Sequence, residues 1–107
     1  MDEVDDDEHG TATLTLEADG TAVIAVAGEI DLSSVDTVRA AIIHAVDCNC
    51  TRLVFDMSEV RFMDSSGFSA LLESRTPPAP VLLRKPSHAV RRLIETTGLG
   101  DVMQIEP

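Results

Sequence analysis

Basic residues are scarce in this sequence. Its 107 residues include eight Lys and Arg against 19 Asp and Glu, so the formal net charge at pH 7 is −11. A chain with that charge is repelled by the phosphate backbone of DNA or RNA. The composition therefore argues against a nucleic-acid partner.

Long apolar stretches are also missing. The longest, AVIAVA at 22–27, is far shorter than the roughly 18 residues that a membrane-spanning helix needs. No basic segment followed by an apolar run and a small-residue cleavage site opens the chain, as it would in a secreted protein. We therefore expect a soluble, cytoplasmic protein with no membrane-embedded part.

Cysteine and histidine are few as well. Cys48 and Cys50 are the only cysteines, and His9, His44 and His88 offer no H-x-x-x-H arrangement to accompany them. Because a structural zinc site usually takes four such ligands, no metal is expected. A disulfide between residues two apart would be strained, and a cytoplasm keeps thiols reduced. We expect two free thiols.

Negative charge, by contrast, is concentrated at the start of the chain. Six acidic residues lie among the first eight: Asp2, Glu3, Asp5, Asp6, Asp7 and Glu8. Such a block cannot bury apolar surface. Residues 1–10 are therefore interpreted as an acidic disordered tail, with an electrostatic docking tail as the alternative. Residues 11–107 have the length of one domain.

Hydrophobic periodicity divides that domain into alternating strands and helices. Alternation in TATLTLE and a nearly continuous apolar run after Asp19-Gly20 predict a β-hairpin whose second strand is the more central. The apolar run in RLVFDM predicts a strand at the centre of the sheet. The segments that follow the hairpin are a helix in 31–47, this strand in 52–57, a helix from 65, a strand in 80–85, a helix in 86–98 and a strand in 101–105. The order β-β-α-β-α-β-α-β predicts an α/β fold, a single layer domain with a mixed, mostly parallel sheet and helices packed on it.

Capping residues and breakers set the expected helix boundaries. The first helix has one apolar face, made of Val35, Val38, Ala41, Ile42, Ala45 and Val46. Ser33, with Asp36 three residues on, resembles a capping pair at its start. The second helix should be about ten residues long and end at TPP, 76–78. Ser87 and Gly98 are the expected cap and stop of the third.

Two kinds of chemistry can be weighed against these residues. A serine hydrolase needs a G-x-S-x-G elbow and a histidine base, and DSSGFS is not that elbow. Asp56 ends the central strand, where a receiver domain carries its phosphorylated aspartate. A receiver also needs an acidic pair after its first strand and a late lysine, whereas here Lys85 is the only lysine. The simpler interpretation is that Asp56 caps a turn in DMSEV.

An acid and two hydroxyls directly precede a helical pattern in FMDSSGFSALL, residues 62–72. Asp64 or Ser65 is expected to accept a hydrogen bond from a free N–H of the first turn, with Gly67 allowing close packing. A phosphoryl group on such a hydroxyl would meet the same N–H groups and the positive end of the helix dipole. Capping and phosphate acceptance are therefore compatible roles here.

Three segments together resemble the STAS domain of bacterial anti-sigma factor antagonists. They are VAGEIDLSSVDTVRAAI, LVFDMSEVRFMDSSGFSALL and PSHAVRRLIETTGLGDVMQI, and the resemblance runs from about Thr13 to Ile105. It implies a phosphorylation-controlled binding module rather than an enzyme, with no cofactor of its own. In this family the unphosphorylated antagonist binds an anti-sigma factor, which is also a serine kinase, and so frees the sigma factor for transcription.

The resemblance also implies roles for particular residues. Ser65 matches the residue that the kinase phosphorylates, an event that releases the antagonist until a phosphatase of the PP2C type restores it. Asp31 matches the aspartate of the partner-binding loop, and Asp64, Ser66 and Gly67 flank the acceptor in the partner-binding surface. We expect the protein to be a monomer.

Two other interpretations stay open. The chain could be a STAS scaffold that binds a partner without phosphorylation, Ser65 acting only as a helix cap, or, less favoured, a receiver-like acceptor at Asp56. The sequence also departs from the family pattern, because only RTPPA lies where relatives usually have a longer helix and a glycine-rich turn. A second helix shorter by about two turns puts in question the partner contacts made by that helix.

Overall fold

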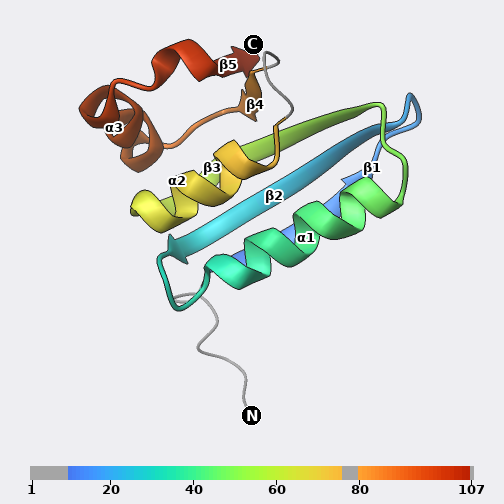
Figure 1. The fold of residues 1–107 in the computed structure, drawn as a ribbon, viewed down its shortest axis with the longest axis horizontal. Coiled ribbons are helices and arrows are strands. Elements are labelled where there is room, and N and C mark those ends of the chain that lie inside the picture. The colour runs from blue at the N-terminus through green and yellow to red at the C-terminus, as the bar shows by residue number, and fades with distance from the viewer. Residues whose placement is uncertain (1–9, 76–79, 107) are drawn as a thin grey trace.

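The chain folds into the predicted order of strands and helices (Figure 1). The structure is a computed structural model that describes residues 10–75 and 80–106. Its elements are β1 (Thr11–Leu16), β2 (Thr21–Ile30), α1 (Val35–Asp47), β3 (Arg52–Met63), α2 (Ser65–Glu73), β4 (Val81–Arg84), α3 (His88–Thr97), the 3-10 helix η2 (Gly100–Val102) and β5 (Met103–Glu106). The acidic residues 1–9 and the helix stop predicted at 76–78 lie outside the described residues. Gly10, the last residue assigned to the tail, is buried.

The strands form one five-stranded sheet in the order β1-β2-β3-β4-β5. β1 is antiparallel to β2, and all other neighbours are parallel. The predicted hairpin is confirmed, and its turn contains Gly20 at φ 92°, a conformation that favours glycine. The central place of the LVF strand is also confirmed, because β3 lies third and its Val54 and Phe55 are buried.

Helices α1 and α2 pack on the sheet next to one another, α1 along β1 and β2 and α2 along β3 (Figure 1). α3 packs against β3 and contributes Val90 to the core. The largest core side chains come from both layers: Ile24, Ile30, Phe55, Met57, Phe68, Leu71 and Leu83. This shared core fixes where α1 and α2 begin relative to the ends of the strands.

The apolar face of α1 differs from the prediction at one residue. Val35, Val38, Ile42 and Ala45 are buried as predicted, whereas Val46 is 59% exposed. In a helix with 3.6 residues per turn, Val46 lies roughly 60° from the centre of the buried face. The face is thus narrower than the apolar pattern suggested.

β3 continues past Asp56, where the sequence predicted a turn. It runs to Met63 and stays paired with β2 as far as Ile30, across two register shifts. Asp56 Oδ1 accepts hydrogen bonds from Ser58 N at 3.1 Å and Ser58 Oγ at 2.8 Å. The carboxylate therefore bonds locally, as expected of a capping residue, but within a bulged strand. A bulge breaks the alternation of buried and exposed residues, which is why the sequence predicts a strand only in 52–57 and not in 58–63.

The predicted limits of the other late elements are confirmed. α2 has nine residues, close to the ten expected. Ser87 Oγ accepts a hydrogen bond from Val90 N at 3.3 Å, and Gly98 ends α3 at φ 71°. The last strand, β5, pairs with β4 in parallel.

The two cysteines and the helix lengths can be compared with the sequence. Cys48 is exposed, Cys50 is half-buried, and both are free thiols. In the described part of the chain, none of the helices has the length and apolar character needed to cross a membrane.

Candidate functional site

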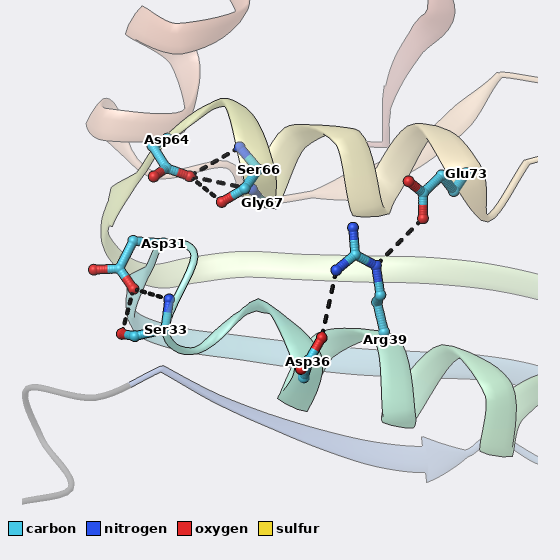
Figure 2. A network of polar contacts seen from close by, with 8 residues as sticks. All are labelled: Asp31, Ser33, Asp36, Arg39, Asp64, Ser66, Gly67 and Glu73. Carbon is cyan, nitrogen blue, oxygen red and sulfur yellow. Dashed lines mark hydrogen bonds and ion pairs between the residues drawn. The ribbon is translucent and has the colours of Figure 1, made fainter.

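The predicted site residues meet at the carboxyl ends of β2 and β3. The two strands end side by side, since Ile30 pairs with Met63. Asp31 and Asp64 follow directly, and Asp64 N donates a hydrogen bond of 3.1 Å to Ile30 O, which ties the two loops together. Figure 2 shows both aspartates at the same edge of the sheet, before the first turns of α1 and α2.

In the loop after β3, Asp64 rather than Ser65 caps the helix. Asp64 Oδ1 accepts hydrogen bonds from Ser66 N at 2.9 Å, Gly67 N at 3.3 Å and Ser66 Oγ at 2.6 Å. These bonds occupy the first free N–H groups of α2, as an N-cap does. Ser65 is exposed, and among the described residues none is hydrogen-bonded to its hydroxyl. Asp64 therefore caps α2 without using the Ser65 hydroxyl.

Gly67 is required by close packing, as the sequence suggested. A Cβ at this position would lie 2.8 Å from Ile30 Cγ2 and 2.8 Å from Met63 Cγ, closer than side-chain atoms approach in folded proteins. The first turn of α2 therefore rests directly on the ends of β2 and β3. This contact holds Ser65 at a fixed place above the sheet edge.

In the loop after β2, Asp31 is bound by the serines that follow it. Asp31 Oδ1 accepts hydrogen bonds from Ser33 N at 3.0 Å and Ser33 Oγ at 2.7 Å. Asp31 N donates to Ser34 Oγ at 3.1 Å, and Ser34 Oγ donates to Glu29 O at 2.8 Å. The hydrogen bonds from Ser33 hold the pKa of Asp31 below its ordinary value of 3.8, so this carboxylate is ionised at pH 7.

The capping pair predicted at Ser33 and Asp36 is wrong. α1 begins at Val35, and its N-cap residue Ser34 makes no side-chain cap hydrogen bond. Ser33 bonds to Asp31 instead, while Asp36 Oδ1 lies 3.4 Å from Arg39 Nη1. A nearby carboxylate is the stronger acceptor for the Ser33 hydroxyl because charge-assisted hydrogen bonds exceed neutral ones.

The two loops share a motif that the sequence reading missed. In Asp31-x-Ser33 and in Asp64-x-Ser66, the aspartate Oδ1 accepts both the N–H and the hydroxyl of the serine two residues on. Asp56-x-Ser58 repeats the pattern inside β3. The recurring Asp-x-Ser triplet was the available signal, since short polar side chains favour such local turns.

An ion pair joins the two helices that carry the loops. Arg39 Nε on α1 lies 3.3 Å from Glu73 Oε1 on α2, and Arg39 also contacts Asp36 (Figure 2). The Glu73 carboxylate raises the pKa of Arg39 above its usual value. Because both side chains are partly exposed, solvent screens the pair and it contributes little to stability. It links α1 to α2, and sequence patterns within one helix do not predict it.

The two described histidines lie outside the site. His44 lies exposed on α1 and His88 starts α3, so neither belongs to the Asp31 and Asp64 loops. Within residues 10–75 and 80–106, no cluster of three or more His, Cys, Asp or Glu could hold a metal ion. What the site offers is a rigid, negatively charged edge with one free hydroxyl, Ser65.

Comparison with known proteins places this chain in a family. The family model described as STAS domain matches residues 13–107. The chain belongs to the STAS domain family. The resemblance noted in the sequence is thus confirmed.

Relatives with known names are similar to it in sequence and structure. The chain is 32% identical over 88 residues to the anti-sigma F factor antagonist of Lysinibacillus sphaericus, covering 78% of this chain and 75% of that protein. An anti-sigma factor antagonist from Mycobacterium paratuberculosis has a TM-score of 0.78 at 29% identity, over 92% of this chain and 86% of that one. SpoIIAA in its unphosphorylated form, an anti-sigma factor antagonist, has a TM-score of 0.68 at 28% identity over 91% of this chain and 89% of that one. The phosphorylated Bacillus SpoIIAA has a TM-score of 0.63 at 28% identity over 91% and 92%.

Proposed function

We propose that this chain is an anti-sigma factor antagonist that binds an anti-sigma factor and so releases a sigma factor for transcription. The similarity to proteins of that name supports this function. The candidate site is a binding surface without a nucleophile and base in reach of each other, which fits a binding regulator rather than an enzyme. Asp31, Asp64, Ser65, Ser66 and Gly67 form the core of the partner surface.

The same proposal makes Ser65 the phosphorylated residue. The observation that carries it is the pattern of hydrogen bonds in DSSG. Asp64 accepts the hydrogen bonds from Ser66 and Gly67, and the Ser65 hydroxyl is left exposed. The kinase is the anti-sigma factor itself, which supplies ATP and Mg²⁺, and a PP2C-type phosphatase reverses the reaction. Because phosphoryl transfer depends on positioning and charge neutralisation, the acceptor needs only to be exposed and rigid.

Charge explains how the phosphate would end binding. A phosphoserine carries about −1.5 to −2 charges at pH 7. On Ser65 it stands beside Asp64, at a sheet edge that already carries the ionised Asp31. An interface fitted to a neutral hydroxyl then meets like charge and a costly desolvation. The fold tolerates the phosphate because it would stand at the amino end of α2, where the helix dipole favours negative charge.

The arrangement at Asp56 does not favour the receiver-like alternative. Its carboxylate is bound to Ser58 within β3, and β3 continues for another seven residues to Met63. An aspartyl phosphate there would be acid-labile, whereas phosphoserine is acid-stable. Treating the phosphorylated protein with acid therefore separates the two acceptors.

Phosphorylation with the cognate anti-sigma factor kinase and ATP tests the assignment. Mass spectrometry should find one phosphate on the wild type, one on Ser69→Ala and none on Ser65→Ala. Ser69→Ala is the matched control because it removes another exposed serine hydroxyl, one turn further along α2 and outside the proposed partner surface. A stoichiometric phosphate that persists in Ser65→Ala removes Ser65 from the mechanism, and no phosphate on the wild type favours a STAS scaffold that binds without phosphorylation.

A further inference from the structure

A large apolar side chain stands exposed inside the candidate site. The exposed large apolar residues of the described chain are Leu16, Leu32, Ile43, Val46, Phe62 and Ile105. Leu32 is the most exposed of them, at 79%, and it lies in the loop between Asp31 and Ser33. Because the Leu32 side chain is mostly exposed, burial in the core of this chain does not explain a leucine at this position.

Leu32 and Ser65 occupy equivalent positions. Each is the middle residue of an Asp-x-Ser motif that follows the paired ends of β2 and β3. The same local hydrogen bonds therefore present a leucine from one loop and a hydroxyl from the other at one edge of the sheet. A partner that binds over Ser65 would therefore also contact Leu32.

The Leu32 loop is also held rigid. Asp31 O accepts hydrogen bonds from Ser34 N at 3.0 Å and Val35 N at 2.8 Å. Ser33 is bound to the Asp31 carboxylate on the other side of Leu32. A side chain presented by a preformed loop loses little backbone freedom when it is buried by a partner, which favours tight binding.

Resting on the proposed function, we infer that Leu32 is the apolar anchor of the anti-sigma factor interface. The anti-sigma factor receives it in an apolar pocket with a basic rim. The rim follows from charge: Asp31 is ionised and lies in the same loop as Leu32, Asp64 lies in the neighbouring loop, and the hydrogen bonds that both carboxylates accept come from serines and backbone N–H groups. Burial of an exposed leucine supplies the affinity, and the acids orient the partner.

A pair of identical substitutions tests this anchor. Leu32→Ser is compared with Leu16→Ser, because Leu16 is also exposed, at 51%, but pairs with Ala22 at the opposite end of the sheet. Affinity of the unphosphorylated full chain for the purified cognate anti-sigma factor is measured by calorimetric titration. Leu32→Ser should weaken binding about 10–100-fold, the equivalent of burying one leucine, and Leu16→Ser should leave it unchanged.

Two further variants keep the outcome clear. Leu32→Met retains the apolar volume and should restore near-wild-type affinity. The urea midpoints of the two Leu32 variants should equal that of the wild type because the Leu32 side chain is 79% exposed. If Leu32→Ser binds like the wild type, or if both Leu→Ser variants weaken binding equally, the anchor is refuted. If Ser65→Asp abolishes binding while Leu32→Ser does not, only this inference fails. If the wild type itself does not bind the anti-sigma factor, the proposed function fails first.

Discussion

Acidic residues at two ends of the sheet have different partners. Near the amino ends of β2 and β3, Glu17 and Glu106 both pair with Arg84, and Glu106 also pairs with Arg52. At the carboxyl ends, Asp31 and Asp64 accept hydrogen bonds from serine side chains and backbone N–H groups instead.

This difference separates two uses of a carboxylate. Where arginines neutralise the acids, the charge serves the fold and is hidden from a partner. Where serines and N–H groups hold them, the carboxylates are fixed in place and keep their full charge. At the second end, a phosphate added to Ser65 would therefore meet like charge from Asp31 and Asp64. The four expectations that follow test this contrast, from the largest effect to the smallest.

An added charge at Ser65 should have the largest effect. Ser65→Asp places a carboxylate beside Asp64 and is expected to weaken binding to the anti-sigma factor about 100-fold, because like charges across a desolvated interface cost several kcal/mol. Circular dichroism should show an intact fold. The matched control is Ser69→Asp, which adds the same charge one turn further along α2 at another exposed serine. Equal losses in both variants would mean that the position of the charge does not matter.

Adding a methyl group at Gly67 should have the next largest effect. In Gly67→Ala the new Cβ would lie 2.8 Å from Ile30 Cγ2 and 2.8 Å from Met63 Cγ, so both side chains would have to shift. The free energy of unfolding is expected to fall by about 1–3 kcal/mol, as for other overpacked cores. Chemical denaturation measures it, with Ser69→Ala as the control on the exposed face of the same helix. An unchanged midpoint would show that the helix start is not seated tightly on the sheet.

Removing a carboxylate from the arginine-paired end should destabilise the fold without affecting binding. Glu106→Gln leaves Arg52 and Arg84 without their shared partner and is expected to cost about 1 kcal/mol of unfolding free energy. Glu95→Gln, on the exposed side of α3, is the control and should cost nothing measurable. If Glu106→Gln weakens partner binding, the proposed difference between the arginine-paired end and the Asp31 and Asp64 end of the sheet is wrong.

The smallest effect concerns pH. Hydrogen bonds from Ser33 lower the pKa of Asp31, and hydrogen bonds from Thr21 lower that of Asp19. A carboxyl group with a lowered pKa stabilises the fold above its ordinary value of 3.8 and loses that contribution as pH falls through the lower folded value. Asp31→Asn and Asp19→Asn should each slightly flatten the loss of stability below about pH 4. Of the two, Asp31→Asn alone should also weaken binding at pH 7, and an effect of Asp19→Asn on binding would count against the site.

The sequence predicted what depends on local signals. The order of elements follows from hydrophobic periodicity, and the Ser87 cap and the Gly98 stop follow from side-chain and backbone chemistry within a few residues. The same local chemistry predicts a helix start at Asp64 and Ser65, and the structure shows that Asp64 is the residue that caps α2.

What the sequence did not predict depends on contacts between elements. β3 extends to Met63 because β2 continues beside it, and bulges hide that pairing from a periodicity analysis. The Ser33 hydroxyl donates its hydrogen bond to Asp31, and no capping pair with Asp36 forms, because the end of β2 fixes where Asp31 lies. The link between Arg39 and Glu73 joins residues 34 apart, which no pattern within one helix can reveal.

The central claim is that a phosphate on Ser65 switches off an interface that the neutral hydroxyl permits. The most direct measurement uses one preparation divided in two, half phosphorylated by the cognate kinase and purified, and compares the affinity of both halves for the anti-sigma factor. The account predicts binding by the unphosphorylated half, a loss of about 100-fold or more in the phosphorylated half, and recovery after treatment with a PP2C-type phosphatase. Equal affinity of the two halves, with the phosphate confirmed on Ser65, would contradict it.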